Sequence, residues 1–402
     1  MGRIDMDKNI KITTIAAIGM FLSMFDTGIV AIAVSHITQS LHGINSSGPL
    51  ILTSYSLMLC GTILFFGDLS SKYGSIIVFK SGMLLLLVSS VLCAFSPSMW
   101  ILILFRGIQG ISAAMIQSTA ITLTSQYVTE KNKTKSIATV ITFASIGPIL
   151  APTVGGFILN YFSWEWLFYI NIPFCLVSLF LSLKIEKVNN NIVRHHQFQL
   201  LIYSSFVISL ISGIIFSMGW LLTASLGLAI LIIYSEIKSK HQGVLFNKHI
   251  LNFKFYLSIL GSLFLGSSTS CMFIIPPIKL LASDNILFVS FIVMTLPVFT
   301  VFISKISPGF IAKYGYQKIC IIGFVFMFAG TLGLLKEQFS TAYTFICLAS
   351  FGIGCGLFQP SNTLMLFQSS DKSYHAMSNS LSRLFVNLGI ALGSSLVAVF
   401  YL

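Results

Sequence analysis

Thirteen apolar segments, separated by short polar stretches, dominate this sequence and restrict what the chain can fold into. A helix needs about 20 apolar residues to cross a bilayer, and a chain inside lipid must satisfy its backbone hydrogen bonds internally. The sequence therefore predicts an all-α polytopic membrane protein with about 13 transmembrane helices. The predicted segments are 12–34, 49–66, 76–95, 99–127, 137–160, 165–183, 199–217, 220–235, 255–276, 286–304, 318–335, 341–367 and 377–401.

Composition excludes the other broad classes of protein. Charged residues make up 8% of the chain, whereas a soluble globular protein has about 25%. The 55% share of hydrophobic residues is incompatible with disorder. The seven cysteines lie inside apolar runs without a Cys-x-x-Cys pair, as small buried hydrophobes do. We therefore expect no disulfide, metal site or cofactor, and the lack of a Gly-x4-Gly-Lys-Ser/Thr motif argues against built-in ATP hydrolysis.

The basic residues predict the orientation of the chain. Lys and Arg number 23 against 11 Asp and Glu. With a cytoplasmic N-terminus, all of them fall in cytoplasmic stretches except Arg106, Lys279, Lys336 and Arg383, as the positive-inside rule requires. This topology explains the net charge better than a nucleic-acid partner does. The first apolar run, 12–34, is too long for a signal peptide, so we expect a multi-pass protein of the cell membrane that retains it.

Two polar linkers and a short repeat indicate how the chain is organised. The stretch 184–198 is the most polar in the chain, and a second linker, 236–254, follows two further apolar segments. Lys-Tyr-Gly occurs at 72–74 and again at 313–315, a faint repeat typical of two halves related by an axis along the membrane normal. The predicted parts are an N-terminal six-helix bundle at 1–183, a linker with two extra transmembrane helices at 184–254, and a C-terminal bundle of five helices at 255–402.

Asp26 is the only carboxylate deep inside a predicted span. An ionisable group there costs about 2.5–3.5 kcal/mol on insertion scales, which makes it a functional candidate by default. A carboxylate that burial and a nearby cation pull in opposite directions can load and release a proton. A structural ion pair and an acid near the interface are the alternatives. The face of the helix that carries Asp26 is small and polar enough to line a cavity. By helical spacing its other members are Gly19, Ser23, Val30 and Ala33.

Arg106 begins a second polar stripe, in the segment 99–127. Because Arg does not lose its proton in proteins, a buried Arg106 needs an acidic partner or a water-filled cavity. Asp26 is the natural partner, and the alternative is that Arg106 reaches the membrane interface. The stripe continues at helical spacing with Gln109, Gly110, Ala113 and Gln117.

The segment 137–160 is rich in small residues and proline. Spacing by four on one face favours close helix packing, and prolines bend a helix. The stretch is therefore either a tight packing seam or a bend that moves during transport, and the sequence favours neither. The residues concerned are Gly147, Pro148, Ala151, Pro152, Gly155 and Gly156.

A predicted loop at 67–74 joins the second and third spans and is bounded by Gly67 and Gly74. It is either a plain turn or a charge latch between helices, made by Asp68 and Lys72.

Taken in order, these motifs resemble those of the major facilitator superfamily, and within it the fourteen-spanner drug:proton antiporters. The resemblance covers nearly the whole chain. The loop 67–74 is similar to the family's loop between spans two and three, with Ser71 where Asp is usual. The further matching stretches are 25–27 in span one, 104–110 with the buried Arg, 147–156 with Ala151 in place of a usual Gly, 164–173 with Glu165 in place of Arg, 352–360 and 383–393.

This resemblance implies a two-bundle fold with two extra linker helices, and alternating access driven by proton influx. It implies export of small amphipathic or cationic compounds such as drugs, with Asp26 as proton carrier and Arg106 as its partner. We expect a monomer that binds small-molecule substrates, protons and membrane lipids, and no nucleic acid. The residues expected along the substrate pathway are Gln109, Gln117, Phe358, Gln359 and Asn362.

Three other hypotheses stay open at this point. The cargo could be a metabolite, a peptide or a lipid. A polytopic membrane enzyme is disfavoured, because the seven histidines lie singly or in loops. The resemblance also implies fourteen spans with both termini cytoplasmic, whereas thirteen place the C-terminus outside. In that case the fold tolerates the loss, another chain supplies the helix, or the protein is a truncated, non-transporting remnant.

Overall fold

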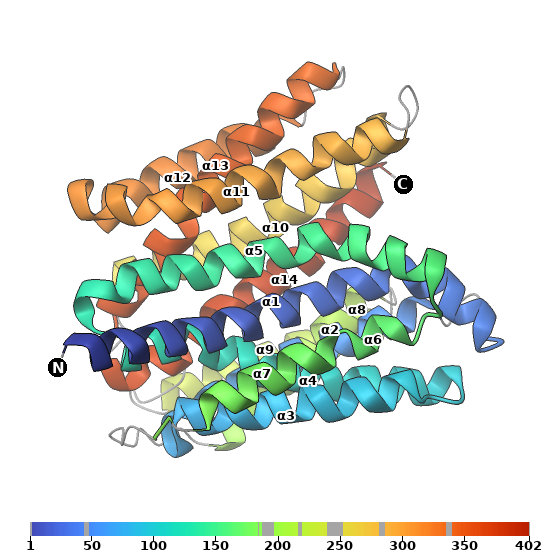
Figure 1. Ribbon diagram of the computed structural model, residues 1–402, viewed down its shortest axis with the longest axis horizontal. Coiled ribbons are helices and arrows are strands. Elements are labelled where there is room, and N and C mark those ends of the chain that lie inside the picture. Colours follow the sequence, from blue (N-terminus) through green and yellow to red (C-terminus); the bar gives the residue numbers. More distant parts are fainter. Residues whose placement is uncertain are drawn as a thin grey trace.

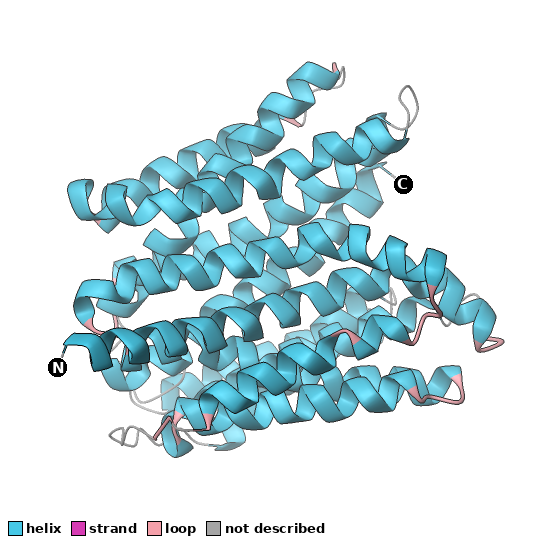
Figure 2. Cartoon of the chain, in the orientation of Figure 1, coloured by secondary structure: helices cyan, strands magenta, loops and turns pink. Residues whose placement is uncertain are grey.

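The computed structural model describes residues 2–43, 48–183, 185–186, 197–215, 219–238, 252–280, 286–334 and 340–401. Long helices run side by side along the long axis of the molecule (Figure 1). Within the described residues there is no β-strand (Figure 2). Nine described helices are long and apolar enough to cross a membrane, or ten when the two bent parts of α5 are taken as one. The predicted all-α membrane fold is confirmed.

Each predicted apolar segment overlaps a helix, and the segment 165–183 is divided into two, α6 and α7. The helices are α1 (Gly2–Ser40), α2 (Gly48–Tyr73), α3 (Ser75–Ala94), α4 (Met99–Tyr127), α5 (Glu130–Tyr161), α6 (Trp166–Tyr169), α7 (Asn171–Ser182), α8 (Gln197–Ile215), α9 (Gly219–Lys238), α10 (Phe253–Leu280), α11 (Ile286–Tyr314), α12 (Tyr316–Gly333), α13 (Thr341–Gln368) and α14 (His375–Tyr401). Much of both predicted linkers, 187–196 and 239–251, lies outside the described residues.

The predicted loop at 67–74 is wrong, because α2 continues through Tyr73. No proline interrupts this stretch, so the helix extends until Gly74 takes a φ of 99°. Other L-residues pay about 1–2 kcal/mol to adopt such a left-handed conformation. The turn is closed by the Gly74 N–H, which donates to the Ser70 carbonyl at 2.9 Å.

The second Lys-Tyr-Gly sequence forms a turn of the same geometry between α11 and α12. Gly315 has a φ of 83°, and its N–H donates to the Ile311 carbonyl at 2.9 Å. Lys72 Nζ lies 5.1 Å from the centre of the Tyr73 ring, and Lys313 Nζ lies 5.1 Å from that of Tyr314. The repeat that is faint in sequence is therefore distinct in local structure.

Helix packing follows one pattern that occurs twice. In the first set α1 packs on α5, α2 on α4, and α3 on α4. In the second, α10 packs on α14, α11 on α13, and α12 on α13. The two sets meet through α5 with α11 and through α2 with α14, while α8 and α9 pack on each other and α8 on α2. Figure 1 shows α5 lying between α1 and α11.

The second set differs from the first at one edge. In the first set α7 packs against α1 and α3. In the described part of the second set, no helix covers the equivalent edge of α10 and α12. An apolar groove of about 500 Å³ lies there, and residues of α10, α12 and α13 border it, among them Leu257, Phe264, Ile321, Phe324 and Phe358.

Candidate functional site

Asp26 and Arg106 form an ion pair in the interior of the first set of helices, and both side chains are fully buried. Arg106 Nη1 donates to Asp26 Oδ2. Gln109 Nε2 donates to Asp26 Oδ1 at 3.3 Å, and Asn171 Nδ2 donates to the same oxygen at 2.9 Å. Three donors, one of them charged, therefore surround the carboxylate. Such bonds are what makes a buried charge tolerable.

The Arg106 guanidinium is less completely bonded than the carboxylate. Nη1 also donates to Gln109 Oε1 at 2.7 Å. The guanidinium carbon lies 4.5 Å from the centre of the Tyr55 ring, a cation–π contact. Nε and Nη2 are buried without a hydrogen-bond partner among the described residues. The cluster thus holds the acid firmly and leaves part of the bonding capacity of the arginine unused.

Ser90 and Asn171 complete this ionic cluster. Ser90 Oγ accepts from Gln109 Nε2 at 2.9 Å and from Asn171 Nδ2 at 3.3 Å. The cluster consequently joins four helices, α1, α3, α4 and α7. Sequence reasoning missed both residues. The signal for Asn171 was an amide within the apolar run that forms α7, a position where an amide needs partners.

The face of α1 that carries Asp26 packs into the protein interior and lines neither the groove beside α10 and α12 nor the central cavity between the two sets of helices. A Cβ added at Gly19 would lie 2.8 Å from the Phe79 ring and 2.9 Å from the Ile116 side chain. This face is therefore closed by α3 and α4. Met24, two residues before Asp26 and so on the opposite side of the helix, lines the central cavity.

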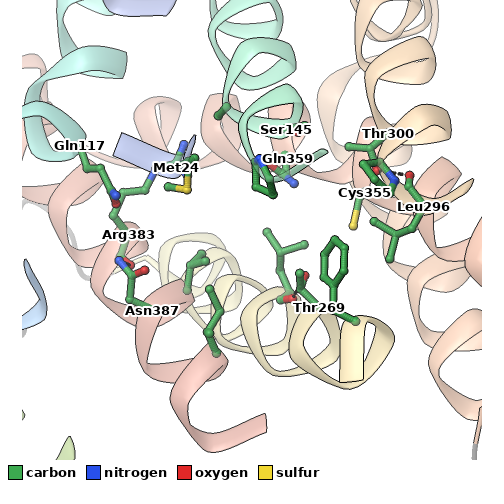
Figure 3. A pocket seen from close by; sticks show the side chains of 17 residues that line it. Met24, Gln117, Ser145, Thr269, Leu296, Thr300, Cys355, Gln359, Arg383 and Asn387 are labelled. Carbon is green, nitrogen blue, oxygen red and sulfur yellow. Dashed lines mark hydrogen bonds between the residues drawn. The ribbon is translucent and has the colours of Figure 1, made fainter. Parts of the chain in front are cut away.

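The central cavity lies where the two sets of helices meet and measures about 160 Å³. A cavity of about 150 Å³ admits a benzene-sized ligand. One wall comes from α1, α4 and α5, and the other from α10, α11, α13 and α14 (Figure 3). The lining is mainly apolar, and its polar and charged members are Gln117, Ser145, Thr269, Thr300, Gln359, Arg383 and Asn387.

The residues predicted along a substrate pathway separate into three places. Gln117 and Gln359 line the central cavity. Gln109 belongs to the ionic cluster. Phe358 and Asn362 border the groove beside α10 and α12, and Asn362 Nδ2 donates to the Ser258 carbonyl at 3.2 Å. A pathway that contains all five is not present in this conformation.

The small residues of α5 form a seam with α1. A Cβ added at Gly147 would lie 2.9 Å from the Phe25 backbone nitrogen, and one added at Gly28 would lie 2.7 Å from the Ala151 Cβ. Pro148, beside Gly147, lines the central cavity. One helix thus contacts the helix of Asp26 on one side and the cavity on the other.

The same helix is bent. Its parts Glu130–Pro148 and Thr153–Tyr161 meet at 43°. Gly155 is buried, whereas a Cβ at Gly156 would meet nothing within 4 Å. Pro152 belongs to the helical backbone, and its side chain is outside the described part. A packing seam and a bend are both present in α5, and movement of this bend during transport stays a prediction.

The end of α2 packs directly on α14. A Cβ added at Gly67 would lie 2.7 Å from the Ser380 Cβ, so the two helices approach closely here. Asp68 Oδ1 is buried without a hydrogen-bond partner among the described residues. Lys72 extends over the Tyr73 ring and forms no ion pair with Asp68. In this conformation Gly67 and Ser380 bring α2 and α14 close together at this end, and an Asp68–Lys72 ion pair takes no part.

Further hydrogen bonds join α14 to α4 at the same end of the bundle, and sequence reasoning missed them. Asn379 Nδ2 donates to the backbone carbonyls of Gln117 at 2.9 Å and Ser118 at 2.8 Å. His375 Nδ1 lies 2.8 Å from Ser125 Oγ. These hydrogen bonds connect α4, which forms part of one wall of the central cavity, to α14, which forms part of the other.

Comparison with known proteins places the chain in a family. Residues 16–394 match the model of the Major Facilitator Superfamily. The Riboflavin transporter RibZ of Clostridioides difficile (strain 630) is 25% identical over 400 residues, which cover 96% of this chain and 87% of that protein. The Multidrug transporter protein MdtP of Bacillus subtilis (strain 168) is 25% identical over 399 residues, covering 94% of this chain and 73% of that protein.

A solved structure shows the same fold. The proton:xylose symporter XylE, bound to 6-bromo-6-deoxy-D-glucose, aligns with a TM-score of 0.70 and 14% identity over 99% of this chain and 92% of that one. At this identity the likeness concerns the fold alone. The family match over most of the chain, the doubled packing pattern and this shared fold together make the protein an integral membrane transporter that belongs to the Major Facilitator Superfamily.

Proposed function

We propose that this protein exports small amphipathic molecules in exchange for protons, by alternating access, as a member of the fourteen-spanner drug:proton subgroup. The observation that carries the proposal is the buried Asp26–Arg106 pair, which lies on the opposite side of α1 from a cavity between the two sets of helices. The protein acts as a monomer in the cell membrane, with its N-terminus in the cytoplasm.

Asp26 carries the proton. In the structure its carboxylate accepts from Arg106, Gln109 and Asn171, an arrangement suited to the charged form. Protonation removes the charge that balances Arg106. Losing one partner of a buried ion pair costs about 3–5 kcal/mol, so the protonated cluster favours a rearrangement of α1, α3, α4 and α7.

The seam between α1 and α5 passes that rearrangement to the cavity. Gly147 and Ala151 contact α1, and Pro148 lines the cavity wall. A shift of α1 therefore moves a helix that touches the cargo. The proton gradient supplies the energy for export against a concentration gradient. One pH unit provides about 1.36 kcal/mol per proton, and a membrane potential of 100 mV adds about 2.3 kcal/mol per charge.

The test is substrate-driven proton movement in proteoliposomes, measured with an internal pH dye for wild type and Asp26→Asn. Candidate substrates come from a thermal-stabilisation screen that includes riboflavin and a panel of drugs, since relatives are named for both. We expect substrate addition to move protons in the wild type and not in Asp26→Asn. Glu130→Gln, which removes an exposed carboxylate from the same half, is the matched control and keeps the signal. Proton movement in Asp26→Asn at the wild-type rate would remove Asp26 from the mechanism.

A further inference from the structure

Arg383 brings a positive charge to the central cavity. It lies on α14 and lines the cavity together with Asn387, one turn further along the helix. Figure 3 shows Arg383 between Asn387 and Gln117, which comes from α4 on the other wall. Arg383 thus lies in the cavity that the proposed function assigns to the cargo.

No acidic side chain balances this charge in the described structure. The cavity lining contains neither Asp nor Glu. The ion pairs among the described residues are Asp26 with Arg106 and Glu130 with Lys133, and no hydrogen bond joins the Arg383 guanidinium to a described side chain. Because a guanidinium stays protonated, the cavity carries a net positive charge.

The contrast with Arg106 is informative, because both arginines lie within membrane-spanning helices. Arg106 is fully buried against the one acid in its surroundings. Arg383 lines the central cavity, where no described residue supplies an acidic partner. An uncompensated charge at membrane depth is costly, and a ligand that supplies the opposite charge removes that cost.

A second polar group in the cavity also lacks a partner. The Gln117 side chain is 1% exposed, and its Oε1 has no hydrogen-bond donor among the described residues. The rest of the lining is mainly apolar and includes Met24, Phe273 and Leu296. The cavity therefore combines a cation and a neighbouring unpaired amide oxygen with a lining that is mainly apolar.

We propose that Arg383 is the anion-recognition residue of this transporter, and that its preferred cargo is an amphipathic anion. Such a molecule carries a carboxylate, sulfonate or phosphate on a compact apolar body, and a donor group for Gln117 strengthens its binding. The inference rests on the proposed function only in taking the central cavity as the cargo site. It departs from the cationic drugs that the family resemblance implies, since a cation in this cavity meets Arg383 as a like charge.

The experiment compares three aromatic probes of matched size and fixed charge: benzenesulfonate, benzenesulfonamide and benzyltrimethylammonium. Binding to protein in lipid nanodiscs is followed by saturation-transfer difference NMR at constant ionic strength, with empty nanodiscs subtracted. We expect the wild type to bind the sulfonate about tenfold more tightly than the ammonium, a difference of about 1.4 kcal/mol. Arg383→Gln abolishes this preference, and Arg383→Lys retains most of it. Lys305→Gln, which removes an exposed positive charge from α11 away from the cavity, leaves the preference unchanged.

Two results would overturn the inference: tighter binding of the ammonium or of the neutral sulfonamide by the wild type, or a sulfonate preference that persists in Arg383→Gln. Size-exclusion profiles and melting temperatures without ligand verify that the variant is folded. Arg383→Lys keeps a positive charge at the same position, so it tests whether the preference depends on charge. Because this binding needs no proton gradient, its outcome is independent of the proteoliposome test of Asp26. Charge selection and proton coupling can thus fail separately.

Discussion

At the scale of single residues, the Asp26–Arg106 pair is a source of specificity more than of stability. Moving two charges out of water costs several kcal/mol per ion, and their attraction recovers that cost only with good geometry and further hydrogen bonds. Here the carboxylate has such bonds from Gln109 and Asn171, while two nitrogens of Arg106 have none. A protein that keeps only one of these two charges should therefore be much less stable than a protein that has neither.

A double-mutant cycle tests this expectation. We expect Asp26→Asn to lower the stability of the protein by about 3–5 kcal/mol, because it leaves Arg106 buried and unpaired. Arg106→Gln should cost a similar amount through the orphaned carboxylate. The double variant should be more stable than either single one. Thermal unfolding in one detergent measures all four proteins, and additive losses would show that the two groups do not depend on each other.

Residue identities predicted part of this site because charges inside a span are rare. One interior acid and one interior arginine in the first half left few pairings to consider. Asn171 and Ser90 could not be placed, since amides and hydroxyls are common in membrane helices and sequence does not give their neighbours. Phe358 was expected in the pocket but borders the groove, because composition does not show which side of α13 faces the cavity.

At the scale of helices, α5 connects the ionic cluster to the cavity through its glycines. Gly147 and Gly156 provide a matched pair on one helix. A Cβ at Gly147 would meet the α1 backbone at 2.9 Å, whereas one at Gly156 would meet nothing within 4 Å. In a helix, alanine is favoured over glycine by about 0.5–1 kcal/mol.

We therefore expect opposite signs for the two substitutions. Gly147→Ala should destabilise the protein by about 1–3 kcal/mol, as over-packing does, and should slow transport. Gly156→Ala should be neutral or slightly stabilising. Melting temperatures and uptake rates in vesicles measure both effects. Equal effects at the two positions would show that the α1–α5 seam is not tight in the membrane.

Element boundaries illustrate what sequence patterns predict at this scale. The apolar segments located every helix of the described residues, because hydrophobicity over about 20 residues is a strong signal. The predicted loop at 67–74 was wrong because hydropathy marks where lipid ends, while the helix of α2 continues to the backbone break at Gly74.

At the scale of the whole molecule, the two sets of helices are joined at the end of the bundle predicted to face the cytoplasm. Asn379 and His375 connect α14 to α4 there, and Gly67 lies against Ser380. In the proposed alternating-access cycle, these contacts between the halves must break when the protein opens toward that side.

Replacing Asn379 should shift the conformational balance of the protein. Asn379→Leu removes two hydrogen bonds between the halves, which are worth about 0.5–1.5 kcal/mol each. We expect longer distances between spin labels at positions 131 and 372, measured by pulsed electron resonance in a cysteine-depleted background. Asn132→Ala is the control, because the Asn132 side chain bonds within its own half, to Thr129. An unchanged distance distribution in Asn379→Leu would mean that this link does not hold the end closed.

The position of Met24 and Asp26 on opposite faces of α1 has a consequence for how such proteins diversify. In the proposed function, the side chains that touch the cargo line the central cavity, and those that surround the acid lie on the other side of α1. Substitutions in the cavity can then change which molecule is accepted without altering any distance in the cluster that holds Asp26. In the proposed function, the same proton-coupling cluster could in this way serve cargoes as different as those for which the relatives RibZ and MdtP are named. Resistance to an inhibitor that fills the cavity can arise by the same route.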